Sequence, residues 1–357
     1  MTTTLDRAEA FCARFGLRLP ILLAPMAGAC SPSLSIAVGQ AGGLGACGGL
    51  LMQPAAITAW AQDVRAGSNG AFQLNLWIPD AAPLRDTAHE AKLRDFLAGF
   101  GPEVAEEAAN ATPPDFNAQC EAMLAAGPAI ISSIMGLYPP DFVARMKAQG
   151  IAWFAIVSTP AEARAAEAAG ADVIVAQGAE AGGHRGSFDP NLAEAQAVGL
   201  FSLLPAVVDA VNIPVVATGG IADSRGIAAA LTLGASAVQI GTGFLRCPEA
   251  KIAPAWADAL GQTAPEATSL TRAFSGRTGR SIATDYVRAA NAAEAPAPAP
   301  YPVQRALTQA MRDQATRDGD IQRMQAWAGQ SAALAQARPA SELATSLWDG
   351  ARALLGG

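Results

Sequence analysis

Short apolar runs alternate with amphipathic, alanine-rich segments along most of the chain. The runs are rich in β-branched residues, which is typical of strands that are buried on both faces of a parallel sheet. The predicted strands are Ile21–Ala24, Gly43–Cys47, Phe72–Leu76, Ala129–Ser132, Trp153–Val157, Val173–Ala176, Val215–Thr218 and Ala237–Ile240.

Helical segments lie between these strands, and several have proline in the first turn and glycine just after the last turn. The predicted helices are Pro32–Gln40, Pro54–Arg65, Pro139–Ala148, Pro160–Ala169, Phe201–Ala210 and Asp223–Leu233. Eight strands, each followed by a helical return, predict an α/β fold of the (β/α)8 TIM-barrel type. A doubly wound open sheet is the alternative, but the even number and regular spacing of the strands favour closure.

Two regions of the chain do not follow the repeat of strand and helix. We expect the barrel to occupy residues 1–285 and to carry a helical insertion at about 80–127, after the third strand. Residues 286–357 then form a linker and a helical C-terminal extension. The linker, Ala289–Pro302, is rich in alanine and proline and is expected to be extended. The helical tail has little apolar content, so we expect it to pack on the barrel and cover part of the site.

Composition narrows the class of partner and the compartment. A hydrophobic fraction of 51% allows a large core, and the net charge of −7 argues against nucleic acid or an anionic membrane as the main partner. Five scattered cysteines without a CxxC pair indicate neither a zinc site nor a disulfide framework. The amino terminus lacks the pattern of a signal peptide, and the run Leu19–Ala29 is too short and broken to span a bilayer. We therefore expect a cytoplasmic protein, and we leave monomer and homodimer open.

The loop after Val173–Ala176 carries polar side chains at the carboxyl end of a predicted strand. Gln177, Gly182 and His184 lie on it, and His184 is one of only two histidines in the chain. Chemistry in α/β barrels is located at this end of the strands. A histidine there can act as a base near neutral pH.

Glycine clusters follow the seventh and eighth predicted strands. Gly219 and Gly220 follow one strand, and Gly241 and Thr242 follow the next. The loops after strands 7 and 8 of a barrel commonly bind phosphate through backbone N–H groups, and glycine leaves room for the phosphate oxygens. The alternative is ordinary turn chemistry, which the pairing of both clusters at adjacent strand ends makes less favourable.

A formal GxGxxG pattern occurs at Gly43–Gly48. A dinucleotide-binding fingerprint needs a strand before the pattern and a helix that begins inside it. Here a predicted helix precedes the pattern, and the glycines lie in or around the second strand. We therefore interpret these glycines as structural.

Five segments together resemble the nitronate monooxygenases, and the AGGH block with APMAG resembles class I of that family. The similarity spans nearly the whole chain, including Met324–Leu334. The segments are PILLAPMAG (Pro20–Gly28), AQGAEAGGHRG (Ala176–Gly186), VVATGGIADSRGIAAAL (Val215–Leu231), VQIGTGFL (Val238–Leu245) and AFSGRTGRSI (Ala273–Ile282).

The resemblance implies FMN, a TIM barrel with extra helices, and oxidation of alkyl nitronates by O2 to a carbonyl product and nitrite. Propionate 3-nitronate is the substrate usually associated with class I. By motif, His184 matches the active-site histidine of the family. The other implied positions are the phosphate site at Gly219, Gly220, Gly241 and Thr242, the flavin ring over Ala24, Pro25 and Met26, and further flavin contacts at Asn75, Gln177, Gly182 and Gln239.

Two roles for His184 stay open at this stage. A neutral imidazole would take the α-proton of a nitroalkane, whereas an imidazolium would bind the anionic nitronate. Two other functions also stay open. One is an FMN-dependent NAD(P)H:quinone or enoyl-thioester reductase on the same barrel, and the other is a phosphate-binding barrel without flavin.

Overall fold

Eight parallel strands form a closed barrel in the computed structural model, which describes residues 3–357. The strands are β1 (Ile21–Leu23), β2 (Gly45–Gly48), β3 (Phe72–Trp77), β4 (Ile130–Ile134), β5 (Ala152–Val157), β6 (Val173–Gln177), β8 (Val215–Thr218) and β9 (Ala237–Ile240). They are arranged in the order β1-β9-β8-β6-β5-β4-β3-β2. A parallel bridge between Leu22 and Leu44 joins the two ends of this sheet, and Leu23 N–H donates to the carbonyl of Leu44 at 2.8 Å. The predicted barrel is confirmed, and the open sheet is not formed.

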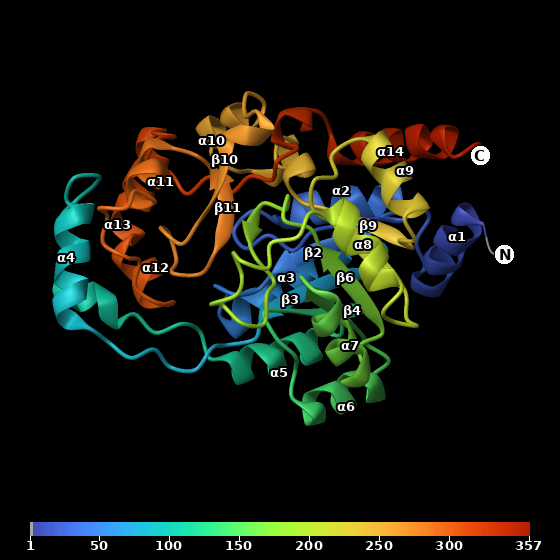
Figure 1. Cartoon of the computed structure of the whole chain (residues 1–357). Helices are drawn as coiled ribbons and strands as arrows, with labels where there is room; N and C mark the ends of the chain where they lie inside the picture. Colours follow the sequence, from blue (N-terminus) through green and yellow to red (C-terminus); the bar gives the residue numbers. More distant parts are fainter. Residues whose placement is uncertain (1–2) are drawn as a thin grey trace.

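Eight helices surround the barrel, and the last of them comes from the end of the chain. They are α2 (Pro32–Ala41), α3 (Pro54–Gly67), α5 (Phe116–Ala126), α6 (Pro140–Ala148), α7 (Pro160–Ala168), α8 (Leu200–Val208), α9 (Ser224–Thr232) and α14 (Ala340–Leu354). The prediction of a direct helical return is wrong for the last strand, because β9 runs into short turns. Instead α14 packs against α9 and α2 and fills the eighth position (Figure 1). Its buried face includes Leu343, Leu347 and Trp348, at helical spacing.

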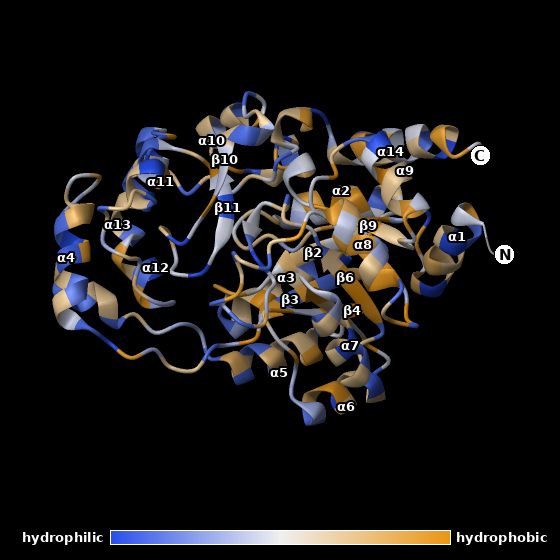
Figure 2. Ribbon diagram, viewed as in Figure 1, coloured by the Kyte–Doolittle hydropathy of each residue, from blue (hydrophilic) through white to orange (hydrophobic). Residues whose placement is uncertain are grey.

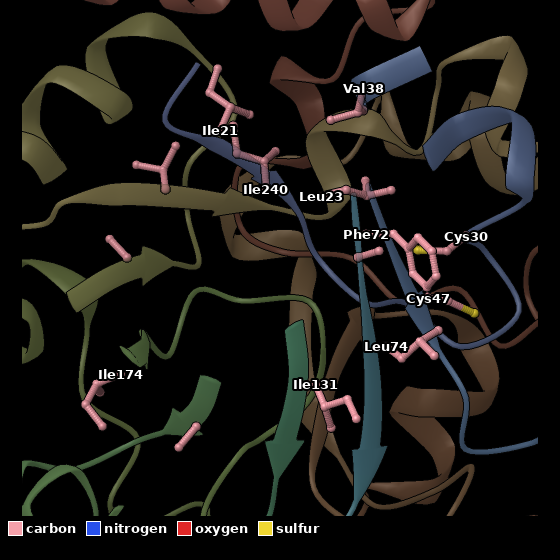
Figure 3. Packing of buried hydrophobic residues seen from close by; sticks show 14 of the residues in the cluster. Ile21, Leu23, Cys30, Val38, Cys47, Phe72, Leu74, Ile131, Ile174 and Ile240 are labelled. Carbon is pink, nitrogen blue, oxygen red and sulfur yellow. The ribbon is translucent and has the colours of Figure 1, made fainter. Parts of the chain in front are cut away.

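The barrel strands separate an inner and an outer core. Leu22 points into the barrel, whereas Ile21 and Leu23 face the helices, because successive side chains of a strand point to opposite sides. Figure 3 shows part of the outer cluster, and Figure 2 shows strand β6 as largely apolar. Helix α1 (Thr4–Phe15), which the sequence analysis did not predict, contributes Phe11 to the inner core, and Phe15 lies edge-on against Phe154 at 5.1 Å.

The insertion and the extension share a second core. Its helices are α4 (Thr87–Leu97), α11 (Asp285–Ala290), α12 (Val303–Leu307) and α13 (Gln309–Asp318), with a 3-10 turn at Glu106–Asn110. Leu93 and Leu97 of α4 belong to one apolar cluster with Tyr286, Leu307 and Met311 (Figure 1). Helix α5 lies within the expected insertion but packs on α3 as part of the barrel. The segment that leaves the barrel therefore ends before α5.

A small antiparallel sheet carries the loop of interest. It consists of β10 (Thr268–Thr271), β11 (Gly279–Ile282) and β7 (Gly183–His184). In the chain, α10 (Pro254–Leu260) lies between β9 and β10, together with 3-10 turns at Thr242–Phe244, Pro248–Ala250 and Pro265–Ala267. A further 3-10 turn, Ala332–Leu334, lies between α13 and α14. Across residues 3–357, none of the helices has the length and apolar character needed to cross a membrane.

Candidate active site

One cavity of about 340 Å³ lies at the carboxyl ends of the barrel strands. Its size is that of small-molecule and cofactor sites. The structure brings all of the sequence-predicted site residues together in its lining: Ala24, Pro25, Met26, Asn75, Gln177, Gly182, His184, Gly219, Gly220, Gln239, Gly241 and Thr242. Residues from both ends of the sequence thus meet in one place.

His184 lies on β7 and is held on three sides. Its Nε2 atom is 2.7 Å from the hydroxyl oxygen of Ser275. The imidazole centroid lies 4.5 Å from the ring of Trp77 and 4.7 Å from the ring of Trp327, both in tilted or edge-on geometry. These contacts fix the orientation of the imidazole at the cavity wall.

The surroundings of His184 favour its neutral form. Burial lowers the pKa of the imidazole to about 3, and the positive charges of Arg305 and Arg277 act in the same direction. The Ser275 hydroxyl has two acceptors within reach, the Arg277 carbonyl at 3.2 Å and His184 Nε2 at 2.7 Å. When the hydroxyl donates to the carbonyl, it accepts from His184 Nε2–H. This assignment leaves Nδ1 as the basic nitrogen. Within residues 3–357, Nδ1 has no hydrogen-bond partner.

Gln177 holds the loop that carries His184. Its Nε2 donates to the carbonyl of His184 at 3.0 Å, and its Oε1 accepts from the backbone N–H of Gly186 at 2.7 Å. One N–H of the amide remains for a ligand. The predicted ligand contact of Gln177 is therefore combined with a structural role that the sequence did not indicate.

Two other amides at strand ends present opposite hydrogen-bonding groups to the cavity. Asn75 uses its Nδ2 to donate to the hydroxyl of Ser132 at 2.9 Å, which leaves Oδ1 as an acceptor. Gln239 accepts at Oε1 from Gln73 at 3.4 Å, which leaves its Nε2 as a donor. The site can therefore bind a flat ring that has donors and acceptors along its edge.

The Ala24–Met26 turn is fixed from behind by Cys30. The Cys30 sulfur accepts from the Met26 N–H and donates to the Ala24 carbonyl, both at 3.2 Å. The Trp60 indole N–H donates to the carbonyl of Cys30 at 2.9 Å. This network presents a rigid surface to the cavity.

Four residues form a cradle of exposed backbone at the ends of β8 and β9, which we call the glycine cradle: Gly219, Gly220, Gly241 and Thr242. Gly219 and Gly220 have φ values of 108° and 69°, which favour glycine. A Cβ atom on Gly220 would lie 3.1 Å from the Cβ atom of Glu180. The Thr242 hydroxyl accepts from Gly329 N–H at 3.0 Å and keeps its own hydrogen for a ligand. Such a cradle suits the oxygens of a phosphate.

The tail segment 325–331 closes the cavity over the glycine cradle. Gln330 N–H donates to the Glu180 carbonyl at 2.9 Å, and the Ser331 hydroxyl donates to the Gly220 carbonyl. A Cβ atom on Gly182 would lie 2.5 Å from the nitrogen of Gly329, so the two loops require glycine where they cross. The helical tail that contains this segment was expected to cover part of the site, and the segment was also part of the family resemblance. Residues that the sequence analysis did not predict for the site include Trp77, Trp256, Arg305, Gln325, Trp327, Gly329 and Ser331.

The polar groups of the lining suit a cofactor that combines a phosphate with a flat polar ring, as a flavin mononucleotide does. The glycine cradle would hold the phosphate, and the Asn75 and Gln239 amides would bind the polar edge of the ring. The left-handed backbone at Gly220 supports this fit, because it favours a residue without a side chain at the edge of the cradle.

A closed barrel with a glycine cradle after its last two strands and a neutral histidine beside it defines a cofactor-binding α/β-barrel enzyme. The profile of the nitronate monooxygenase family matches residues 10–350. The chain belongs to the nitronate monooxygenase family of oxidoreductases, whose members in general depend on a flavin.

Individual relatives agree with this assignment. The chain is 38% identical to a nitronate monooxygenase from Pseudomonas aeruginosa over 95% of its own length and 98% of that protein. The crystal structure of a nitroalkane oxidase from Streptomyces ansochromogenes is 35% identical and has a TM-score of 0.88 over 97% of this chain and 99% of that chain. FabK from Thermotoga maritima is 26% identical, with a TM-score of 0.76 and 97% of each chain covered.

Proposed function

We propose that the protein binds FMN and oxidises alkyl nitronates, with propionate 3-nitronate as substrate, by O2 to a carbonyl product and nitrite. One observation carries the proposal: the glycine cradle and a neutral, oriented His184 face the same cavity. Family membership supports the nitronate chemistry.

The cavity residues divide the binding of FMN among them. The phosphate would lie on the glycine cradle, and the ring over Ala24, Pro25 and Met26. Asn75 would accept from the ring, whereas Gln239 and the remaining N–H of Gln177 would donate to it, with Gly182 alongside. Bound FMN supplies the redox chemistry, while the protein supplies position and electrostatics.

His184 acts in this proposal as a neutral base. Its lowered pKa favours the neutral role over the imidazolium role, since the ring resists protonation in this cavity. Nδ1 would take the α-proton of a neutral nitroalkane, and Ser275 would hold the Nε2–H tautomer. A substrate that arrives as the nitronate has already lost this proton and needs no base.

Anaerobic stopped-flow spectroscopy tests the function. The protein loaded with FMN is mixed with propionate 3-nitronate or with NADH, and the flavin absorbance near ~450 nm is followed. Fast bleaching by the nitronate and none by NADH supports the proposal. Fast bleaching by NADH alone would overturn it in favour of the second candidate, reduction of a quinone or enoyl thioester by NAD(P)H. A protein that takes up no FMN would overturn both.

A further inference from the structure

Arg305 differs from the other arginines around the cavity. Arg277 forms an ion pair with Asp80 at 3.2 Å, and Arg280 donates to the Ala179 carbonyl at 2.8 Å. In the part of the chain that the structure describes, the guanidinium of Arg305 makes neither a hydrogen bond nor an ion pair, although the residue lines the cavity. The guanidinium of Arg305 therefore has no direct partner within the described residues, although the charge of Asp313 acts on it from a distance.

An unpaired cation in a partly enclosed cavity raises the free energy of the folded protein. Burial lowers the pKa of Arg305, which reflects the loss of water around its charge. An arginine nevertheless stays protonated at neutral pH. A bound anion would replace the missing water and remove this cost.

Arg305 lies at the His184 side of the cavity. The ring of Trp77 packs against His184 at 4.5 Å and against Tyr301 at 5.3 Å, and Tyr301 lies just before α12, which carries Arg305. The charge of Arg305 also lowers the pKa of His184, so the two groups are within electrostatic reach. The glycine cradle, in contrast, lies at the ends of β8 and β9.

We propose that Arg305 binds a carboxylate on the substrate, at the end of the molecule away from its nitronate carbon. The guanidinium would form paired hydrogen bonds with the two carboxylate oxygens. The inference rests on the proposed function and makes Arg305 a specificity-determining residue. It predicts a preference for nitronates that carry a second anionic group over simple alkyl nitronates.

Arg305→Met tests the inference with two substrates, propionate 3-nitronate and propyl 1-nitronate, which lacks the carboxylate. We expect KM for propionate 3-nitronate to rise about 10- to 100-fold, as for loss of a charged hydrogen bond. KM for propyl 1-nitronate should change less than about 3-fold, since that substrate makes no contact with the guanidinium. Arg317→Met, at an exposed position of α13, is the matched control and should change neither value.

Calorimetric titration with succinate separates this inference from the proposed function. Succinate has two anionic groups at a spacing similar to that in propionate 3-nitronate, and its binding requires no turnover. We expect the FMN-loaded protein to bind it about 10- to 100-fold more weakly after Arg305→Met. If the wild type binds succinate through Arg305 but oxidises no nitronate, the result supports the anion site at Arg305 and contradicts the proposed function.

Two outcomes would overturn the inference. An equal rise in KM for both nitronates would mean that Arg305 binds the nitronate group itself. Unchanged values for both nitronates and for succinate would mean that the guanidinium contacts no ligand. FMN content and melting temperature are measured on each variant, and Arg305→Gln replaces Arg305→Met if the latter loses its flavin.

Discussion

The imidazole of His184 and the hydroxyl of Ser275 lie 2.7 Å apart although 91 positions separate them in the chain. The pairing of β7 with β11, in which His184 lies opposite Gly279, brings them together. The contact occupies Nε2 and leaves Nδ1 without a hydrogen-bond partner in the described part of the chain. The reactivity proposed for His184 therefore depends on Ser275, a residue of the loop between β10 and β11.

Replacing His184 separates proton abstraction from the later oxidation. We expect His184→Asn to keep FMN bound and to lower turnover of neutral nitroalkanes by at least ~10²-fold, the lower range for loss of a general base. Turnover of preformed nitronates should fall much less. Steady-state rates on both substrate forms, at equal FMN content, check this. An equal loss on both forms would point to anion binding or positioning instead.

Ser275→Ala removes the hydroxyl that fixes the orientation of the His184 imidazole but leaves the imidazole itself in place. We expect turnover of neutral nitroalkanes to fall about 3- to 10-fold, the range for loss of one neutral hydrogen bond. Ser275→Thr keeps the hydroxyl and should restore most of the rate. A merely structural role of Ser275 would instead lower activity on nitroalkanes and on nitronates alike, together with the melting temperature.

His184 should stay neutral far below its ordinary pKa of 6.5. Burial and the neighbouring arginines lower the pKa to about 3, so the folded protein without ligand should show no protonation of this ring between pH 5 and 8. Since the unfolded chain binds this proton below pH 6.5, His184 reduces stability as pH falls from 6.5 toward 3. NMR of ¹³C-labelled histidine measures the titration, and His184→Asn identifies the signal against His89. A midpoint near 6.5 would contradict the prediction.

Gly220→Val should release FMN from the glycine cradle. Valine at φ 69° is strained, and its Cβ atom would lie 3.1 Å from that of Glu180 and crowd the place of the phosphate. Gly150 has a φ of 70° with open space around it, so Gly150→Val is the matched control for strain alone. Both variants should lose stability, by about 1–3 kcal/mol, but only Gly220→Val should lose flavin on gel filtration. Full flavin retention by Gly220→Val would exclude the proposed phosphate site.

Local patterns in the sequence predicted the repeating part of the fold. The eight barrel strands follow from short apolar runs, because a strand buried on both faces needs apolar residues throughout. His184 and the glycine cradle were predicted because the residues after barrel strands converge at one end of the sheet. The remaining predicted lining residues, Ala24, Pro25, Met26, Asn75 and Gln239 among them, followed from the family resemblance. Helix α1 was missed although it is amphipathic, because it precedes the first strand and lies outside the strand–helix repeat.

Short-range patterns that repeat at each strand end specify the barrel and the glycine cradle. Long-range packing places α14 in the eighth helix position, and it makes residues 325–331 the part of the tail that covers the cradle. The tertiary structure also brought Ser275 to His184 and left Arg305 without a partner in the described chain. These features join segments far apart in the chain, and no local pattern of residues specifies which distant segments will pack together.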